Sequence, residues 1–413
     1  MMPSIADYTS VVGEEVVDHL RQIAAPLKGM RVVHVNSTRV GGGVAEILVK
    51  LIPLMADLGL DVSWEVIEGS PRFYQCTKGF HNGLQGQPVN LSDSLLKAYE
   101  ETNAATAEGF GRRLSDADLV FVHDPQPALL RHYTPNRRGK WVWRCHIDLS
   151  RPHRPVWKYL RSIVNQYNAS IFSLADFAQP MDHPMYLVPP SIDPLSEKNI
   201  PLPQAELDEV RDRFGLDGGR PMVLQVSRFD RFKDPLGVLA AFRMAREFYP
   251  GMQCVLAGGG ASDDPEGEAV LAEVHQAANG DPDIKVLLLP ADAHRTINAL
   301  QRVADIVVQK SLREGFGLTV TEAMWKSKPV LGGDTGGIRL QVVNHHTGFL
   351  VSTPEGAALR MRYLLNHPAI LDQMGRKAHR FVRENFLLTR HLREYLTLMV
   401  AVAHGGQDRI VLG

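Results

Sequence analysis

Two segments of the sequence repeat one layout: a short run rich in valine and leucine, a loop, a stretch with helical periodicity and a second short apolar run. The expected elements are strand Arg31–Asn36, helix Val44–Leu58 and strand Asp61–Ile67 in the first segment, and strand Met222–Ser227, helix Pro235–Phe248 and strand Gln253–Gly258 in the second. Apolar runs that bracket a helix are typical of βαβ units, in which helices cover both faces of a parallel sheet.

Further strands of the same kind follow each segment. They are expected at Asp118–Asp124, Lys140–Leu149, Ala169–Ala175, Ile284–Pro290, Ala304–Lys310 and Lys328–Gly333. Between the two groups lies VPPSIDPLSEKNIPLP, whose prolines disfavour helix and indicate a connector. We therefore expect an α/β fold of two doubly wound, Rossmann-like domains that face each other across a cleft, residues 1–195 and residues 196–387.

The end of the sequence predicts one more helix, from about residue 388 to residue 413. Apolar side chains recur there at helical spacing, at Leu388, Leu392, Tyr395, Leu396 and Met399. We expect this helix to pack back on the first domain.

Composition excludes several classes of function. The 45 Lys and Arg nearly balance the 46 Asp and Glu, so no global field attracts nucleic acid or an anionic membrane. No apolar run approaches the ~20 residues that span a bilayer, and the first residues do not resemble a signal peptide. Three separated cysteines indicate ordinary buried thiols in a reducing compartment. We expect a soluble, cytoplasmic protein.

Open α/β sheets bind ligands beyond the carboxyl ends of their strands, so the loops there are the candidate sites. Gly41, Gly42 and Gly43 follow the first strand and precede a helix, where backbone N–H groups can approach an anion. The spacing is not GxGxxG, and a tight turn explains these glycines equally well.

Two cations, Arg228 and Lys233, follow the first strand of the second half in the stretch QVSRFDRFKD. A bidentate arginine and a mobile lysine suit a diphosphate. Taken alone, the two cations are better explained by a solvated loop.

The stretch REGFGLTVTEAM contains two glutamates eight residues apart. Glu314 follows a predicted strand, and Gly315 and Gly317 permit a sharp turn into a helix expected at Leu318–Lys326. The free N–H groups at the start of that helix offer a second anion site. A carboxylate accepts two hydrogen bonds from a sugar diol, so Glu314 and Glu322 suit a sugar–diphosphate–ribose ligand. A helix-terminal charge and a solvated helix face are the simpler explanations.

Polar pairs also follow two strands of the first half: His123 with Asp124, and His146 with Asp148. Two such pairs at neighbouring strand ends indicate a pocket for a hydroxyl-rich ligand.

Metal sites are weakly indicated. The DxD matches at residues 116–118 and 281–283 lie before strands, away from the expected cleft, and DDPEG at residues 263–267 also reads as a turn. We expect no essential metal. The sequence has no GxSxG and no GxxxxGK[ST], which disfavours a serine hydrolase and a P-loop kinase.

Together these motifs resemble the retaining glycosyltransferases of the GT-B fold, in family 4. The family's Glu-x7-Glu element matches EGFGLTVTE, and its upstream basic motif matches SRFDRFK. Longer stretches are similar to the branch that contains trehalose glycosyltransferring synthases and trehalose phosphorylases: HVNSTRVGGGVAEIL, VHDPQP, WRCHIDLS, PPSIDPLSEKN and REGFGLTVTEAMWKSKPV. The similarity extends over nearly the whole chain.

The resemblance implies roles for individual residues. Arg228 and Lys233 would neutralise the donor diphosphate without a metal, assisted by the helix start at Gly317, Leu318 and Thr319. Glu322 would bind the ribose hydroxyls and Glu314 the donor sugar. In the other domain, Gly42 and Gly43 would approach the phosphate, and His146 would lie near the sugar 6-hydroxyl and the reacting centre. Our own hypothesis places the acceptor glucose at Asp124, Gln126 and Asp148.

The implied reaction transfers glucose from a nucleoside-diphosphate glucose, as co-substrate, to free glucose, giving α,α-trehalose with retention. Chemistry alone makes Glu314 a candidate nucleophile. The resemblance implies instead a front-face substitution that is stabilised electrostatically. No tightly bound cofactor is expected, and the expected partners are small sugars and nucleotides; a homodimer is compatible with the sequence.

Three alternatives stay open at this point. A trehalose phosphorylase would use inorganic phosphate in place of the nucleoside diphosphate. A family-4 transferase could use another acceptor, such as a sugar phosphate or a lipid. A sugar-nucleotide sensor would bind without turnover.

Overall fold

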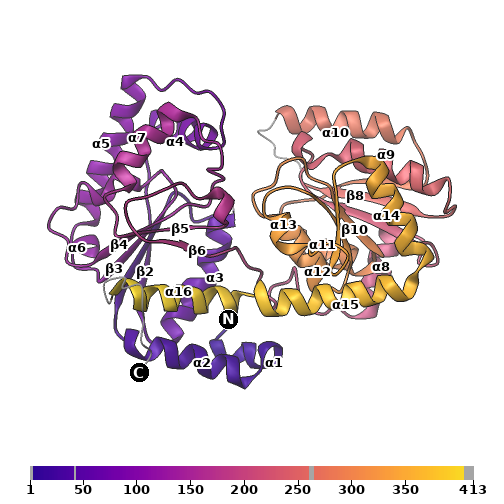
Figure 1. The fold of residues 1–413 in the computed structure, drawn as a ribbon, viewed down its shortest axis with the longest axis horizontal. Coiled ribbons are helices and arrows are strands. Elements are labelled where there is room, and N and C mark those ends of the chain that lie inside the picture. Colours follow the sequence, from indigo (N-terminus) through magenta and orange to yellow (C-terminus); the bar gives the residue numbers. More distant parts are fainter. Residues whose placement is uncertain (1–2, 41–42, 260–264, 404–413) are drawn as a thin grey trace. The chain divides into compact units, whose positions relative to one another are not determined.

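The computed structural model describes residues 3–40, 43–259 and 265–403, and it divides into two compact units (Figure 1). Unit 1 comprises the chain up to Pro190 and the segment from Leu388 onward, and unit 2 comprises Ser191–Leu387. Each unit contains one six-stranded parallel sheet with helices on both faces.

The sheet of unit 1 has the order β2-β1-β3-β4-β5-β6. Its strands are β1 (Arg31–Asn36), β2 (Asp61–Val66), β3 (Leu119–His123), β4 (Lys140–Arg144), β5 (Ala169–Phe172) and β6 (Met185–Leu187). All neighbours pair in parallel, with His34 opposite Phe121 and His123 opposite Arg144. From β1 the chain adds β2 on one side of the sheet and then adds β3 to β6 on the other side. The strand order therefore reverses between β1 and β3.

Helices on one face of this sheet build an aromatic core. The helices of that face are α4 (Pro71–Leu84), α5 (Asp93–Phe110) and α7 (Arg154–Val164). Their Phe73, Phe80, Tyr99 and Trp157 pack in one buried cluster with Trp143 of β4. The first 190 residues also contain two short helices, α1 (Thr9–Val12) and α6 (Arg112–Ser115).

The opposite face of the sheet carries α2 (Glu14–Ala24), α3 (Gly43–Asp57) and the last helix, α16 (Leu388–Ala403). Helix α16 packs against α2 and α3. Its Tyr395 lies 5.2 Å from Phe121, measured between ring centroids. Arg390 donates to the carbonyl oxygens of Pro189 and Pro190 at 3.0 and 2.8 Å, which ties the start of α16 to the end of the first chain segment.

Unit 2 repeats the pattern with the order β12-β11-β10-β7-β8-β9. Its strands are β7 (Met222–Val226), β8 (Gln253–Gly258), β9 (Ile284–Leu288), β10 (Ile306–Gln309), β11 (Val330–Gly333) and β12 (Gly348–Val351). Here the order reverses between β7 and β10.

Two groups of helices enclose the sheet of unit 2 (Figure 1). One group is α9 (Pro235–Arg246), α10 (Pro265–Ala278) and α14 (Pro354–Asn366); the other is α8 (Gln204–Phe214), α11 (His294–Val303), α12 (Leu318–Trp325) and α13 (Ile338–Gln341), with α15 (Pro368–Asn385) packed against α12. The proline-rich connector lies on α11, since Asn298 Nδ2 donates to the carbonyl oxygens of Glu197 and Ile200 at 2.8 and 2.9 Å.

Every predicted strand is present, most of them one to three residues shorter at an end. The largest difference is the strand predicted at Lys140–Leu149, which ends at Arg144. The chain leaves the sheet there because the His146 N–H donates to the Asp124 carboxylate instead of a neighbouring strand, at 2.7 Å. Strands β6 and β12 were not predicted; each is a short edge strand.

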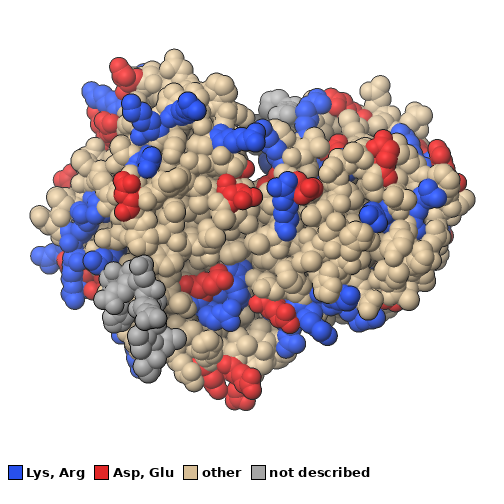
Figure 2. Space-filling model, in the orientation of Figure 1, with Lys and Arg blue, Asp and Glu red and all other residues tan. Residues whose placement is uncertain are grey.

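Charges of both signs are interspersed on the face drawn in Figure 2, which agrees with their nearly equal numbers. All three cysteines are buried and free, as predicted. Within the described ranges, no helix is both long and apolar enough to cross a membrane.

Candidate active site

In both units the candidate residues gather where the strand order reverses. The loops after β7 and β10 carry the basic motif and the first glutamate of unit 2, and those strands are neighbours. The carboxyl edge at such a reversal is where open α/β sheets bind ligands.

The loop after β7 is held by its own carboxylates. Asp230 Oδ1 accepts from the Phe232 N–H at 2.7 Å and starts a short 3-10 turn that ends at Lys233. Gln225 Nε2 donates to the Lys233 carbonyl oxygen at 2.7 Å. Asp234 then adopts φ 52° and caps α9 by accepting from the Gly237 N–H at 3.1 Å. These bonds fix the backbone from which the Lys233 side chain extends.

Lys233 and Glu314 form an ion pair. Lys233 Nζ lies 2.7 Å from Glu314 Oε2, and their side chains are 18% and 10% exposed. Ser311 Oγ donates to the same carboxylate oxygen at 3.2 Å. The pair joins two loops that are 81 residues apart in sequence. Charge-assisted bonds of this kind are stronger than neutral ones and fix both side chains.

Arg228 behaves differently. Its side chain is 63% exposed, and Nη2 lies 3.5 Å from Asp230 Oδ2, a long contact for an ion pair. The guanidinium is thus near the same loop but accessible to solvent. One cation nearby was not among the predicted site residues: Lys310, just after β10, is almost fully buried and pairs with Asp234.

The loop between Glu314 and α12 depends on two glycines in left-handed conformations. Gly317 has φ 84° and is the N-cap of α12. Gly336, with φ 45°, packs so closely that a Cβ atom there would lie 1.8 Å from the Glu314 carbonyl oxygen. With Gly317 as its N-cap, helix α12 begins at Leu318. The first N–H groups of a helix have no partner within the helix. This is the predicted anion-binding position at Gly317, Leu318 and Thr319.

Glu322 lies one turn into α12 and is only 6% exposed, so it does not lie on a solvated helix face. Lys326 is buried one turn further on, and its Nζ donates to the Glu322 carbonyl oxygen and to Asn199 Oδ1, both at 3.1 Å. Burial lowers the pKa of Lys326 to about 7, while the negative charge of Glu322 opposes that shift. The nearby ammonium offsets part of the cost of burying the carboxylate.

In unit 1 the structure brings Asp124 and His146 together. Asp124 has φ 62°, a conformation that Asn and Asp adopt more readily than other side chains. Its Oδ1 accepts from the His146 N–H at 2.7 Å. Burial raises the pKa of Asp124 to about 7, against the opposing effects of that hydrogen bond and of Arg144. His146 also bonds His123, with Nε2 3.0 Å from His123 Nδ1.

Helix α5 holds the loop that contains Gln126. Tyr99 Oη donates to the Pro125 carbonyl oxygen at 2.7 Å, and Asn103 Nδ2 donates to the Gln126 carbonyl oxygen at 3.1 Å. Gln126 Oε1 is buried without a hydrogen-bond partner among the described residues. The oxygen therefore keeps unused capacity to accept a hydrogen bond.

Two other predicted residues are less well connected. Asp148 Oδ1 accepts from the Ser150 N–H at 2.8 Å, a local turn that does not join it to Asp124. Gly43 is the first residue of α3, and a Cβ atom there would meet nothing within 4 Å, so close packing does not require this glycine. Gly42 lies outside the described residues, as do Asp263 and Asp264.

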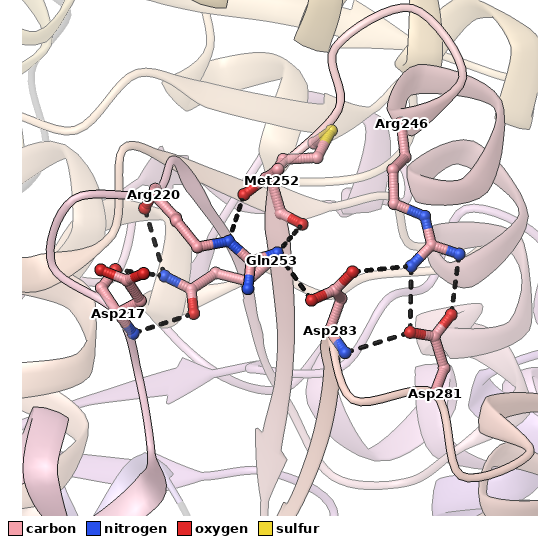
Figure 3. A network of polar contacts seen from close by, with 8 residues as sticks. Asp217, Arg220, Arg246, Met252, Gln253, Asp281 and Asp283 are labelled. Atoms are coloured by element: carbon pink, nitrogen blue, oxygen red, sulfur yellow. Dashed lines mark hydrogen bonds and ion pairs between the residues drawn. The ribbon is translucent and has the colours of Figure 1, made fainter.

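The two DxD matches have structural partners at the amino ends of the strands. Arg246 contacts Asp281 and Asp283 at 2.8 and 3.2 Å, and Arg220 contacts Asp283 at 2.6 Å (Figure 3). Asp118 accepts from the Arg31 N–H at 2.9 Å. Over the described part of the chain, no group of three or more His, Cys, Asp or Glu side chains could hold a metal ion.

Comparison with known proteins shows two matching families. Residues 34–179 match the family described as trehalose synthase, N-terminal domain, and residues 207–381 match glycosyl transferases group 1. A trehalose synthase from Pyrococcus horikoshii is 45% identical over 96% of this chain and 95% of its own length. A trehalose phosphorylase from Pleurotus pulmonarius is 28% identical over 98% of this chain but 62% of its own length.

A solved structure supports the fold alone. A UDP-forming α,α-trehalose-phosphate synthase from Burkholderia xenovorans has a TM-score of 0.72 at 16% identity, covering 91% of this chain and 99% of that one. The two parallel α/β units are therefore those of a GT-B protein. Near full-length identity of 45% to a trehalose synthase shows the family. The chain belongs to the trehalose synthase family of GT-B glycosyltransferases and is an enzyme of trehalose-related glycosyl transfer.

Proposed function

We propose that the protein transfers glucose from a nucleoside-diphosphate glucose to the anomeric hydroxyl of free glucose, forming α,α-trehalose reversibly and with retention. The observation that carries this proposal is the ion pair of Lys233 and Glu314 at the strand reversal of unit 2. It puts a half-buried cation and a carboxylate side by side, as a ligand with both a diphosphate and a sugar diol requires.

In this proposal unit 2 binds the donor. Lys233, the accessible guanidinium of Arg228 and the start of α12 at Gly317, Leu318 and Thr319 stabilise negative charge on the diphosphate. Glu314 accepts hydrogen bonds from the glucose hydroxyls, and the buried Glu322 accepts those of the ribose. Leaving-group charge is neutralised by these residues, so no metal is required for the chemistry.

The bond changes balance without an enzyme nucleophile. The bond from the donor C1 to the phosphate oxygen breaks, and the oxygen of the acceptor's anomeric hydroxyl attacks from the same face. The proton of that hydroxyl passes to the departing phosphate oxygen. Glu314 is paired with Lys233 and Ser311 in the structure, a setting that suits a positioning carboxylate better than a free nucleophile.

Unit 1 provides groups for sugar hydroxyls. We assign the acceptor glucose to Asp124, Gln126 and Asp148, and His146 to the donor sugar near its 6-hydroxyl. The unpartnered Gln126 Oε1 and the hydrogen-bonded Asp124 support the assignment of the acceptor to this edge of the sheet.

The reverse reaction tests the proposal and separates it from the phosphorylase alternative. Trehalose is incubated with the enzyme and ADP, UDP, GDP or inorganic phosphate in separate reactions, and the products are identified by mass. We expect a nucleoside-diphosphate hexose with at least one of the nucleotides. Hexose phosphate formed with inorganic phosphate alone would identify a phosphorylase instead.

A further inference from the structure

Three histidine rings form a hydrogen-bonded row across the sheet of unit 1. His34 Nδ1 lies 3.0 Å from His123 Nε2, and His123 Nδ1 lies 3.0 Å from His146 Nε2. The rings are nearly parallel, with interplanar angles of 26° and 19°. They come from β1, from the end of β3 and from just after β4, which are adjacent strands. The row leads from the sheet interior to the proposed sugar site.

All three rings are neutral near pH 7. Burial lowers the pKa of His34 to about 3, and burial lowers the pKa values of His123 and His146 well below the ordinary value. The positive charge of Arg144 lowers the pKa values of His123 and His146 further, and so does His391. A neutral imidazole has one N–H and one acceptor nitrogen, so each bond in the row has one direction.

The inner end of the row determines that direction. His34 Nε2 is buried and has no hydrogen-bond partner among the described residues, where the ring lies on Phe121 at 4.8 Å between centroids. If His146 donated inward, His123 would donate to His34, and His34 Nε2 would carry a buried N–H without an acceptor. If His34 donates outward through Nδ1, its Nε2 carries only a lone pair, and that lone pair lacks a donor. Orphaned buried N–H groups are the rarer of the two in proteins.

We infer that His34 and His123 are positioning residues that hold His146 in the Nδ1–H tautomer. In this arrangement His34 donates to His123, and His123 donates to His146 Nε2. His146 Nδ1, which bonds no described residue, then presents an N–H to the substrate. This step rests on the proposed role of His146. The partner of the His146 Nδ1–H is then a sugar or phosphate oxygen that accepts a hydrogen bond. The bond made by one ring nitrogen decides the protonation of the other.

The tautomers can be read independently of activity. Full-length enzyme labelled with ¹⁵N-histidine gives separate Nδ1 and Nε2 signals in long-range ¹H–¹⁵N correlation spectra, assigned with single His variants. We expect the Nδ1–H tautomer at His34, His123 and His146. An Nε2–H tautomer at His146 in the unmodified enzyme would overturn the inference, whatever reaction the enzyme catalyses.

A pair of variants at the inner end tests the relay. His34→Phe keeps an aromatic ring on Phe121 but removes the donor. His34→Asn loses the ring but can place an amide N–H where Nδ1 lies. We expect His34→Phe to populate Nε2–H at His146 and to lower kcat/KM ~10-fold or more, and His34→Asn to restore both most of the way.

The control is His183→Phe, which removes a histidine that bonds Ser170 Oγ at 2.6 Å outside the row. It should leave the His146 tautomer and kcat/KM unchanged. Thermal melting of each variant shows that it is folded. A folded His34→Phe enzyme with an unchanged His146 tautomer would contradict the relay, as would equal rates in His34→Phe and the unmodified enzyme.

Discussion

The ammonium of Lys233 lies 2.7 Å from the carboxylate of Glu314, across two loops that follow the adjacent strands β7 and β10. Neither residue is informative by itself in the sequence, where each has an ordinary surface explanation. Because the two side chains are in contact at the strand reversal, they form one site. In the proposed function, Lys233 binds the diphosphate half of the donor and Glu314 binds its sugar half.

Lys233→Ala should lower kcat by about 10²–10³-fold, because a preorganised charge on the leaving group is removed. Arg231→Ala is the control: it removes a cation from the same turn, but one that pairs with Glu273 on α10 at 2.6 Å. Initial rates and thermal melting of both variants provide the comparison. If Lys233→Ala turned over like Arg231→Ala, the diphosphate assignment would be wrong.

Glu314→Gln should lower kcat/KM by about 10–10²-fold, since the amide cannot keep the ion pair with Lys233 or accept two strong hydrogen bonds from a diol. Ser311→Ala, which removes the 3.2 Å bond to the same carboxylate and the 3.2 Å bond that Ser311 Oγ accepts from Gln309, should cause a smaller loss. Mass spectrometry of enzyme quenched during turnover should show no added hexose. A glycosyl ester on Glu314 would replace the front-face mechanism with a covalent one.

Asp124→Asn should change how stability depends on pH. The pKa of Asp124 is raised to about 7 in the folded protein, so its stabilising contribution is complete below the unfolded pKa and is lost as pH rises through about 7. Asn keeps an oxygen for the His146 N–H and tolerates the left-handed backbone. The difference in unfolding free energy, unmodified minus variant, should fall between about pH 4 and about pH 7 and then level off.

Denaturant unfolding of both proteins at several pH values measures this difference. Asp116→Asn, at an exposed aspartate, is the matched control and should show no such slope. A flat difference for Asp124→Asn would mean that its carboxyl has the same pKa in the folded and the unfolded protein.

Arg246→Gln should destabilise unit 2 by about 1–3 kcal/mol at pH 7 without changing kcat, because it leaves the partly buried Asp281 without its guanidinium and Asp283 with only that of Arg220. The hydrogen bonds from Arg246 hold the pKa of Asp281 below its ordinary value. The contribution is therefore present above the unfolded pKa and is lost as pH falls through the folded one, so the variant and the unmodified protein should converge below about pH 4.

The control for this variant is Arg21→Gln, which breaks a solvent-exposed pair with Asp18 and should cost no more than ~0.5 kcal/mol. Equal effects of the two substitutions on the unfolding midpoint would show that the network in Figure 3 is only a surface feature.

The sequence predicted most of the fold because buried parallel strands are short apolar runs and are recognisable locally. It predicted β1 and β8 to the residue, whereas β6 and β12 are apolar but only three and four residues long. The two glutamates and the basic motif were likewise found from their place after predicted strands.

The contacts between distant residues could not be predicted in this way. Lys310 looked like the last residue of a strand, and its partner Asp234 lies 76 residues earlier. His34 is one polar residue inside RVVHVN, and its row with His123 and His146 exists only because β1, β3 and β4 are neighbours in this register. Strand order decides such contacts, and no local pattern encodes it.

The most direct test of the proposed function is synthesis from a labelled acceptor. Enzyme is incubated with [1-¹³C]glucose and unlabelled nucleoside-diphosphate glucose, and the product is examined by ¹³C NMR and mass spectrometry. We predict a singly labelled disaccharide in which the label is an α-anomeric carbon bonded through oxygen to a second α-anomeric carbon. A β linkage, a label at a reducing end, or a product formed only from glucose 1-phosphate would contradict the proposed function.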